Sequence, residues 1–181
     1  MKIRENLYLV ASTNMCFDWT HPSDCNVYLL ESNGELALID SGTGESVEHI
    51  LSYIESIGYS IQQLKKVILT HIHADHAGGA SELKKRTGAE VFVHEGAAEI
   101  LASGDENAID LTTAKKSGFY PPDYIFKACE ADHLLKNGAL FNVGFLTVKV
   151  VETPGHSKFD LSFIISGEEE TYLFSAHTVL F

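Results

Sequence analysis

Residues 70–79 read THIHADHAGG and place three histidines and one aspartate within six positions, 71–76. The run VILT at 67–70 has the texture of a buried strand, and a helical pattern follows the motif. His71 and His73, two residues apart in extended chain, would project in one direction, while Asp75 and His76 would open the helix. Because imidazole and carboxylate are ligands for zinc and iron, the stretch predicts two neighbouring metal pockets. Histidines of a solvated loop, the alternative, are not expected at this density.

The chain on both sides of this motif alternates strand-like and helix-like segments. Asn33-Gly34 between two apolar runs predicts a hairpin, and apolar spacing over 46–59 predicts a helix. Pro121 and Pro122 forbid regular structure through 117–126, so short helices in a surface excursion are expected over 95–132. Strands are expected at 6–10, 26–32, 35–40, 67–70, 90–94, 139–143, 145–152, 160–166 and 171–176, and further helices at 80–86 and 95–104. The alternation predicts an α/β layered fold in a single domain, residues 1–181.

Composition narrows the classes of partner. Thirteen Lys and Arg against twenty-five Asp and Glu give a net charge of -12, so neither nucleic acid nor an anionic membrane surface is an expected partner. No stretch is long and apolar enough to be a signal peptide or a membrane span. The three cysteines, Cys16, Cys25 and Cys129, form no CxxC pattern, so no disulfide framework or zinc ribbon is indicated. We expect a cytoplasmic protein with a small-molecule substrate, and we allow a homodimer.

Three motifs in order carry a resemblance to a known family. HIHADH at 71–76, LIDSG at 38–42 and TPGHS at 153–157 resemble the HxHxDH motif, the strand-end aspartate motif and the next histidine segment of the metallo-β-lactamase superfamily. The spacing is most similar to its glyoxalase II-like branch. The resemblance implies an αββα sandwich with metals at one edge of two β-sheets. Because the chain ends in the apolar run TYLFSAHTVLF, we expect the C-terminal portion to be missing or shortened.

The resemblance also implies a set of metal ligands. His71, His73 and His156 would hold the first metal, and Asp75 and His76 would contribute to a second. The metal would be Zn(II), one or two ions, with Fe(II)/Fe(III) or Mn(II) as alternatives. Asp40 would orient one of the metal ligands by a hydrogen bond, without binding the metal itself. As an alternative, IDSG is an ordinary cap between a strand and a turn. His156 taken alone could be a turn histidine after Pro-Gly, and the ligand assignment depends on HIHADH.

The chain departs from the family pattern at His177. The family carries an aspartate that bridges both metals within something like LFSGDTLF, whereas this chain reads LFSAHTVLF. A neutral imidazole presents one lone pair and cannot bridge two ions. We therefore expect His177 either to complete a four-ligand first site or to join Asp75 and His76 at the second. A mononuclear site is the further alternative.

The leading functional hypothesis is metal-dependent hydrolysis of a small ester, thioester, lactone or amide by activated water, with Asp75 as the catalytic carboxylate. The alternatives are an iron-dependent oxidoreductase of the same superfamily, of the persulfide dioxygenase-like or diiron kind, and a degenerate member that binds metal without turnover. The loop at 15–24, MCFDWTHPSD, holds Phe17 and Trp19, which would either cover the sheet edge or form a flap over the substrate.

Overall fold

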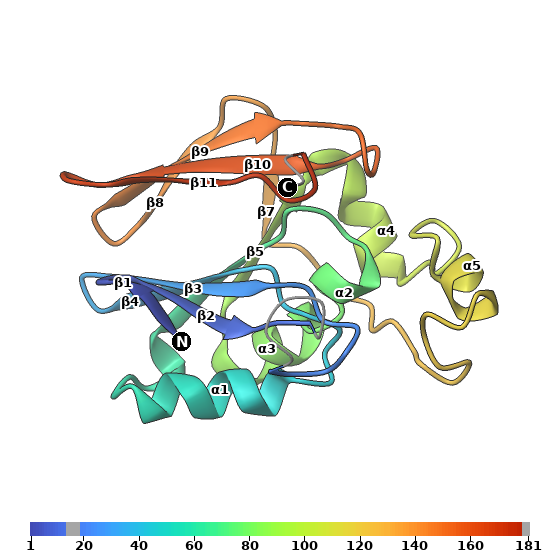
Figure 1. Ribbon diagram of the computed structural model, residues 1–181. Helices are drawn as coiled ribbons and strands as arrows, with labels where there is room; N and C mark the ends of the chain where they lie inside the picture. Colours follow the sequence, from blue (N-terminus) through green and yellow to red (C-terminus); the bar gives the residue numbers. More distant parts are fainter. Residues whose placement is uncertain (14–18, 179–181) are drawn as a thin grey trace.

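Two β-sheets stacked face to face form the centre of the molecule, in a computed structural model that describes residues 1–13 and 19–178 (Figure 1). Within those residues the larger sheet has seven strands in the order β1-β2-β3-β4-β5-β6-β7, and the smaller has four in the order β11-β10-β9-β8. Pairing is antiparallel from β1 to β4, parallel from β4 to β7, and antiparallel throughout the smaller sheet. The strands span Lys2–Arg4 (β1), Leu7–Ala11 (β2), Val27–Ser32 (β3), Glu35–Ile39 (β4), Leu64–Ile68 (β5), Glu90–His94 (β6), His133–Leu135 (β7), Leu140–Val143 (β8), Leu146–Glu152 (β9), Leu161–Ser166 (β10) and Thr171–Phe174 (β11).

Helices cover one side of this sandwich. In Figure 1, α1 and α3 lie beneath the larger sheet, and α2 lies at one end of the sandwich. In the described part of the chain no helix lies over the outer face of the smaller sheet (Figure 1). The helices span Val47–Ser56 (α1), Ala74–Ala77 (α2), Ala80–Thr87 (α3), Ala98–Ser103 (α4) and Leu111–Lys116 (α5), with 3-10 turns at Ile61–Gln63 (η1) and Glu95–Ala97 (η2). The architecture is the mixed α/β sandwich that the sequence predicts.

The side-chain pattern of each strand reflects how many of its faces are covered. In β4, Leu36 and Leu38 face the helices, while Ala37 and Ile39 face the smaller sheet. Both faces of β4 are buried, so the strand is a continuous apolar run. In contrast, β9 alternates buried and exposed residues along most of its length. Such alternation is typical of a sheet with one face in the core and one in solvent.

Most of the predicted elements are confirmed, with shifts at their ends. Asn33 and Gly34 both have positive φ, 54° and 76°, as a two-residue hairpin turn requires. The strand predicted at 67–70 is wrong in its bounds, because β5 begins at Leu64. Lys66 is tolerated within β5 because its ammonium pairs with Glu35 on the neighbouring strand. The short strands β1 and β7 were not predicted, since three residues carry too little pattern.

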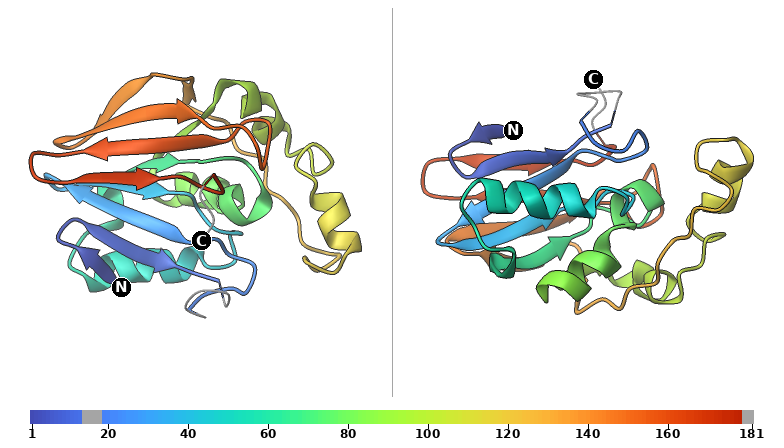
Figure 2. Two further views of the ribbon diagram at one scale, coloured as in Figure 1. Left: turned by 45° about the horizontal axis from the view of Figure 1, so that its top comes forward. Right: turned by 90° about the horizontal axis from the view of Figure 1, so that it is seen from below.

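The segment between α4 and β7 corrects one expectation. It contains the short helix α5 and no regular structure through 119–132, as the two prolines require, and α5 projects to one side of the sandwich (Figure 2). However, Tyr120, Tyr124 and Phe126 are buried in the core between the larger sheet and its helices. The aromatic side chains of this segment therefore return to the core, so it is more than a surface excursion.

Among the described residues, none of the helices is both long enough and apolar enough to span a lipid bilayer.

Candidate metal centre

The ends of β4 and β5 bring the first two motifs together. These strands are parallel neighbours, so the residues after them emerge at the same edge of the sheet. The Asp40 N–H donates to the carbonyl oxygen of Ile68 at 2.9 Å, which places Asp40 beside Thr70 and His71. Asp40 has φ 64°, a left-handed conformation that Asp adopts more readily than most residues. The turn after β4 thus directs its carboxylate toward the residues that follow β5.

Three of the predicted ligands converge as one group. The ligand nitrogens of His71, His73 and His156 all lie within 4.8 Å of one another. Nδ1 of His73 and Nε2 of His156 are 2.9 Å apart. Two nitrogens on one tetrahedral zinc ion would be separated by about 3.3 Å, given Zn–N bonds of about 2.0–2.1 Å. The spacing of this triad is therefore close to that of a zinc site.

His156 reaches the triad because a buried carboxylate holds its turn. Asp160 is 3% exposed, and its side chain accepts hydrogen bonds from the backbone N–H and the hydroxyl of Ser157. Its backbone carbonyl accepts from Thr153 N–H at 2.9 Å, which closes the turn around His156. Leu161 N–H donates to Thr70 O at 2.8 Å and so ties the start of β10 to the loop after β5. The TPGHS segment is thus attached directly to the HIHADH loop.

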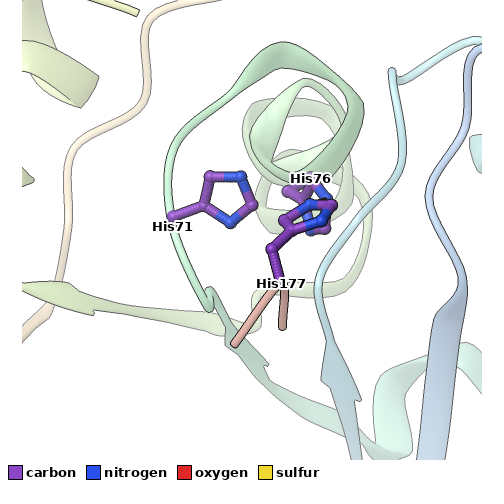
Figure 3. A group of neighbouring side chains, drawn as sticks. All are labelled: His71, His76 and His177. Carbon is purple, nitrogen blue, oxygen red and sulfur yellow. Dashed lines mark hydrogen bonds between the residues drawn. The ribbon is translucent and has the colours of Figure 1, made fainter. Parts of the chain in front are cut away.

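A second group forms around His76. Figure 3 shows His71 on the loop after β5, His76 on α2 and His177 on the C-terminal segment, with their rings gathered together. Nε2 of His177 lies 3.1 Å from Nε2 of His76. Oδ2 of Asp75 lies 3.3 Å from the same His76 nitrogen. His177 is also close to the first triad, because its ring centroid lies 4.0 Å from that of His156. The distances are compatible with both positions considered for His177.

Asp40 and Thr70 fix which nitrogen of each buried histidine is free. Asp40 Oδ2 lies 2.8 Å from Nδ1 of His76, so this carboxylate accepts the Nδ1 proton and leaves Nε2 as the nitrogen that faces the site. Thr70 Oγ1 lies 3.1 Å from Nδ1 of His71, while the Thr70 hydroxyl and N–H both donate to Asp40. In this arrangement His71 also presents Nε2. Asp40 therefore contacts Thr70 and His76, which both belong to the candidate site.

The charges of the site follow from burial and neighbouring carboxylates. Burial, followed by the neighbouring imidazoles, lowers the pKa of His71 far below the ordinary value. Burial also lowers the pKa of His73 and His177. Burial lowers the pKa of His76, but two carboxylates act against it. Asp40 lies beside Nδ1 and Asp75 beside Nε2, and the pKa of His76 is well above its ordinary value. Neutral His71, His73 and His177 are in the form that binds a metal, whereas His76 would have to release its Nε2 proton to bind one.

The donor set fits a metal ion. Nε2 of His71 is buried and makes no hydrogen bond to any residue in the described part of the chain. An unpaired polar atom in the interior costs about 1–3 kcal/mol, so native proteins rarely leave one without a partner. The residue that carries this nitrogen belongs to both groups, with His73 and His156 in one and with His76 and His177 in the other. A metal ion among these nitrogens would satisfy it.

Several neighbours of the site were not anticipated from sequence. Thr70 is one, although its position beside HIHADH was a usable signal. Asp24 is another: it is 2% exposed and accepts hydrogen bonds from the backbone of His21 and Thr43 and from the Thr43 and Ser46 hydroxyls. Asp24 thereby joins the loop before β3 to the turn after β4. No periodicity or motif marks such a residue.

Trp19, expected either to cover the sheet edge or to form a flap over the substrate, packs on helix α1. Its ring packs edge-on against His49 and Tyr53 on α1, with centroids 5.5 and 5.6 Å away, and so covers that helix. Phe17 lies outside the described residues. A cavity of about 1110 Å³ opens beside Asp75, His76 and His177 and extends between the sheet edges formed by the N-terminal strands and β11. The site therefore has room for a small organic molecule.

Several known proteins are similar to this chain in sequence. The sequence model described as "Metallo-beta-lactamase superfamily" matches residues 21–181. The hydroxyacylglutathione hydrolase of Rhodopseudomonas palustris is 33% identical over 117 residues, which cover 65% of this chain and 34% of that protein. The human acyl-coenzyme A thioesterase MBLAC2 is 25% identical over 170 residues, which cover 85% of this chain and 58% of that protein.

The fold is shared with solved structures as well. The metallo-beta-lactamase GOB-18 from Elizabethkingia meningoseptica aligns with a TM-score of 0.74 at 26% identity, over 96% of this chain and 58% of that one. The chain thus spans between about a third and two thirds of the length of the relatives it matches. The match over residues 21–181, the sandwich and the clustered histidines agree, and the chain belongs to the metallo-beta-lactamase superfamily.

Proposed function

We propose that this protein is a metal-dependent hydrolase of a small ester, thioester, lactone or amide. The observation that carries the proposal is the buried and unpaired Nε2 of His71, a residue that belongs to two groups of clustered imidazoles. His71, His73 and His156 would hold one ion, and Asp75, His76 and His177 would hold another. Zn(II) is the proposed metal, because three imidazoles at this spacing, with a position left for water, form a catalytic zinc site.

When bound, the metal supplies Lewis acidity, which makes a water molecule more acidic and polarises a substrate carbonyl. The chain's own residues would transfer the proton and orient the ligands. Asp75, with 26% of its side chain exposed, is able to accept a hydrogen bond from the attacking water and to pass the proton to the leaving group. Asp40 holds the Nδ1 proton of His76, which fixes the orientation of that ring.

Thioesters are the first substrates to test. One relative is named a thioesterase and another a hydroxyacylglutathione hydrolase. The cavity beside Asp75, His76 and His177 is large enough for such molecules. Because the net charge is -12, we do not propose nucleic acid as a substrate. A cytoplasmic location and assembly as a homodimer are further proposals, tested by cell fractionation and light scattering.

The test compares zinc-loaded protein, chelator-treated protein and the variant His73→Ala on a panel of p-nitrophenyl esters, glutathione and coenzyme A thioesters, and lactones. His73 is partly exposed, so its removal should spare the fold. We expect turnover only in the loaded wild type, with kcat/KM at least 100-fold lower in His73→Ala. Wild-type activity in that variant would refute the assigned ligands. Tight zinc binding without turnover on the whole panel would favour a non-catalytic member.

One observation supports a second candidate, an iron-dependent oxidoreductase. His76, His177 and Asp75 together offer two imidazoles and one carboxylate, a set typical of non-haem Fe(II) sites. Metal analysis of protein purified without chelators separates the two functions. Iron with oxygen consumption on adding a thiol or persulfide would favour the oxidoreductase, whereas zinc with hydrolysis of the panel would favour the hydrolase.

A further inference from the structure

One buried hydroxyl near the site has no partner. Tyr120, in the segment between α5 and β7, is 4% exposed. Its phenol oxygen is fully buried and makes no hydrogen bond within the described ranges 1–13 and 19–178. Leaving a buried hydroxyl unpaired costs about 1–3 kcal/mol, so the group calls for a functional explanation.

The charge that this phenol faces is the carboxylate of Asp75. Burial raises the pKa of Tyr120, and the proximity of Asp75 raises it further. The phenol is therefore neutral at physiological pH and keeps its O–H proton, so it can only donate toward a carboxylate. The Asp75 side chain contacts Nε2 of His76 at 3.3 Å, and a phenol donor on a second side would further restrict its orientation.

The surroundings hold the Tyr120 ring firmly. The ring contacts those of Phe119 and Tyr124, with centroids 5.2 and 5.1 Å away. Tyr124 is fixed by its own hydroxyl, which donates to Thr43 O at 2.7 Å. A Cβ on Gly78 would lie 2.5 Å from that hydroxyl, so the glycine after α2 leaves the room that Tyr124 occupies. The Tyr120 phenol is thus part of a packed aromatic cluster close to Asp75, whose carboxylate acts on its pKa.

We propose that Tyr120 is a positioning residue for Asp75: its phenol donates a hydrogen bond to one carboxylate oxygen and leaves the other free for the metal or the attacking water. The inference rests on the proposed function, because it assigns Asp75 its part there. A ligand carboxylate held by an outer hydrogen bond keeps one orientation, and loss of such a partner typically weakens metal binding by about 10- to 100-fold.

The test pairs Tyr120→Phe with the matched control Tyr124→Phe, each of which removes one buried phenol oxygen. Binding of Co(II) is measured by chelator competition and by its visible spectrum, and the unfolding of metal-free protein is measured in urea. Tyr120→Phe should leave the unfolding midpoint unchanged or raised, because the lost hydroxyl had no partner. It should also weaken Co(II) binding by about 10-fold and change the spectrum. Tyr124→Phe should lower the midpoint, because a buried bond is lost, and leave Co(II) affinity within about two-fold.

A double-mutant cycle with Asp75→Asn completes the test. If Tyr120 acts through Asp75, removing its hydroxyl has no further effect on Co(II) binding once the carboxylate is gone. Equal Co(II) affinity in Tyr120→Phe and wild type, or an equal loss in the presence and absence of the Asp75 carboxylate, would overturn the proposal. Co(II) binding and unfolding are measured without turnover. If the protein were inactive on the whole substrate panel, the proposed function would be refuted, and these two measurements would still test the role of Tyr120. With an active substrate, kcat should fall in Tyr120→Phe while KM stays unchanged.

Discussion

Replacing Asp40 with Asn tests how the structure supports its metal ligands. Asp40 is 4% exposed and accepts from Thr70 N–H and from Nδ1 of His76, each at 2.8 Å. The residue has φ 64°, a conformation that Asn tolerates as well as Asp, so Asp40→Asn changes the charge and not the backbone. The amide keeps one acceptor oxygen and turns an N–H₂ group toward the other donor. One of the two contacts must therefore fail.

The size of the effect follows from which contact fails. If the amide nitrogen meets Thr70 N–H, a buried donor is left unpaired at a cost of about 1–3 kcal/mol. If it meets His76 instead, the ring can accept from the amide only with its proton on Nε2, the nitrogen that faces His177 and the site. That tautomer cannot bind a metal there. We expect zinc affinity to fall by about 10- to 100-fold, or about 1.4–2.7 kcal/mol, and unfolding free energy by about 1–3 kcal/mol.

The assay is zinc competition with a chromophoric chelator, with urea unfolding of the metal-free protein measured alongside. Asp24→Asn is the matched control, because Asp24 is 2% exposed and also accepts several hydrogen bonds, none of them from a proposed ligand. It should lose similar stability and keep wild-type zinc affinity. Unchanged zinc affinity in Asp40→Asn, or an equal loss in both variants, would refute the reasoning.

Three shorter predictions follow from the same geometry. Gly79→Ala places a Cβ 2.2 Å from Ser41 O and should lower the urea midpoint by the equivalent of at least about 2 kcal/mol, whereas Gly155→Ala, with no atom within 4 Å, should leave it unchanged. His177→Asp supplies a carboxylate able to bridge, so mass spectrometry should show the second zinc retained at about 10-fold lower free zinc; equal retention would contradict this. Metal-free protein should lose about 2 kcal/mol of stability from pH 7 to 5 through His71, because the unfolded histidine takes up a proton near pH 6.5 and the folded one, with its lowered pKa, does not. The raised pKa of His76 offsets part of this loss. Urea titrations that give equal stability at pH 7 and pH 5 would contradict the prediction.

Local pattern was enough for much of the fold. Asn33-Gly34 determined a hairpin and its register, since both residues occupy the left-handed region that a two-residue turn requires. The helical spacing of 46–59 predicted α1, and the strand predicted at 90–94 is β6. The bounds of β5 failed because Lys66 reads as polar, and only the neighbouring Glu35 makes its position in a sheet favourable. Burial of Tyr120 and Phe126 could not be predicted either, because it depends on a core that distant segments build.

For the site, the sequence by itself indicated which side chains are candidate ligands, and the tertiary structure decided which groups each of them contacts. HIHADH has four side chains able to bind a metal within six positions, so their proximity can be predicted from the sequence. His156 and His177 join that group from 80 or more residues away, and only the packing of the two sheets brings His177 within 3.1 Å of His76. The free nitrogens of His71 and His76 are set by Thr70 and Asp40, and the unpaired phenol of Tyr120 becomes visible only through burial. The type of each residue is given by the sequence. Distances, burial and the choice of protonated nitrogen depend on tertiary structure, because they are set when segments remote in sequence pack together in the low-dielectric interior.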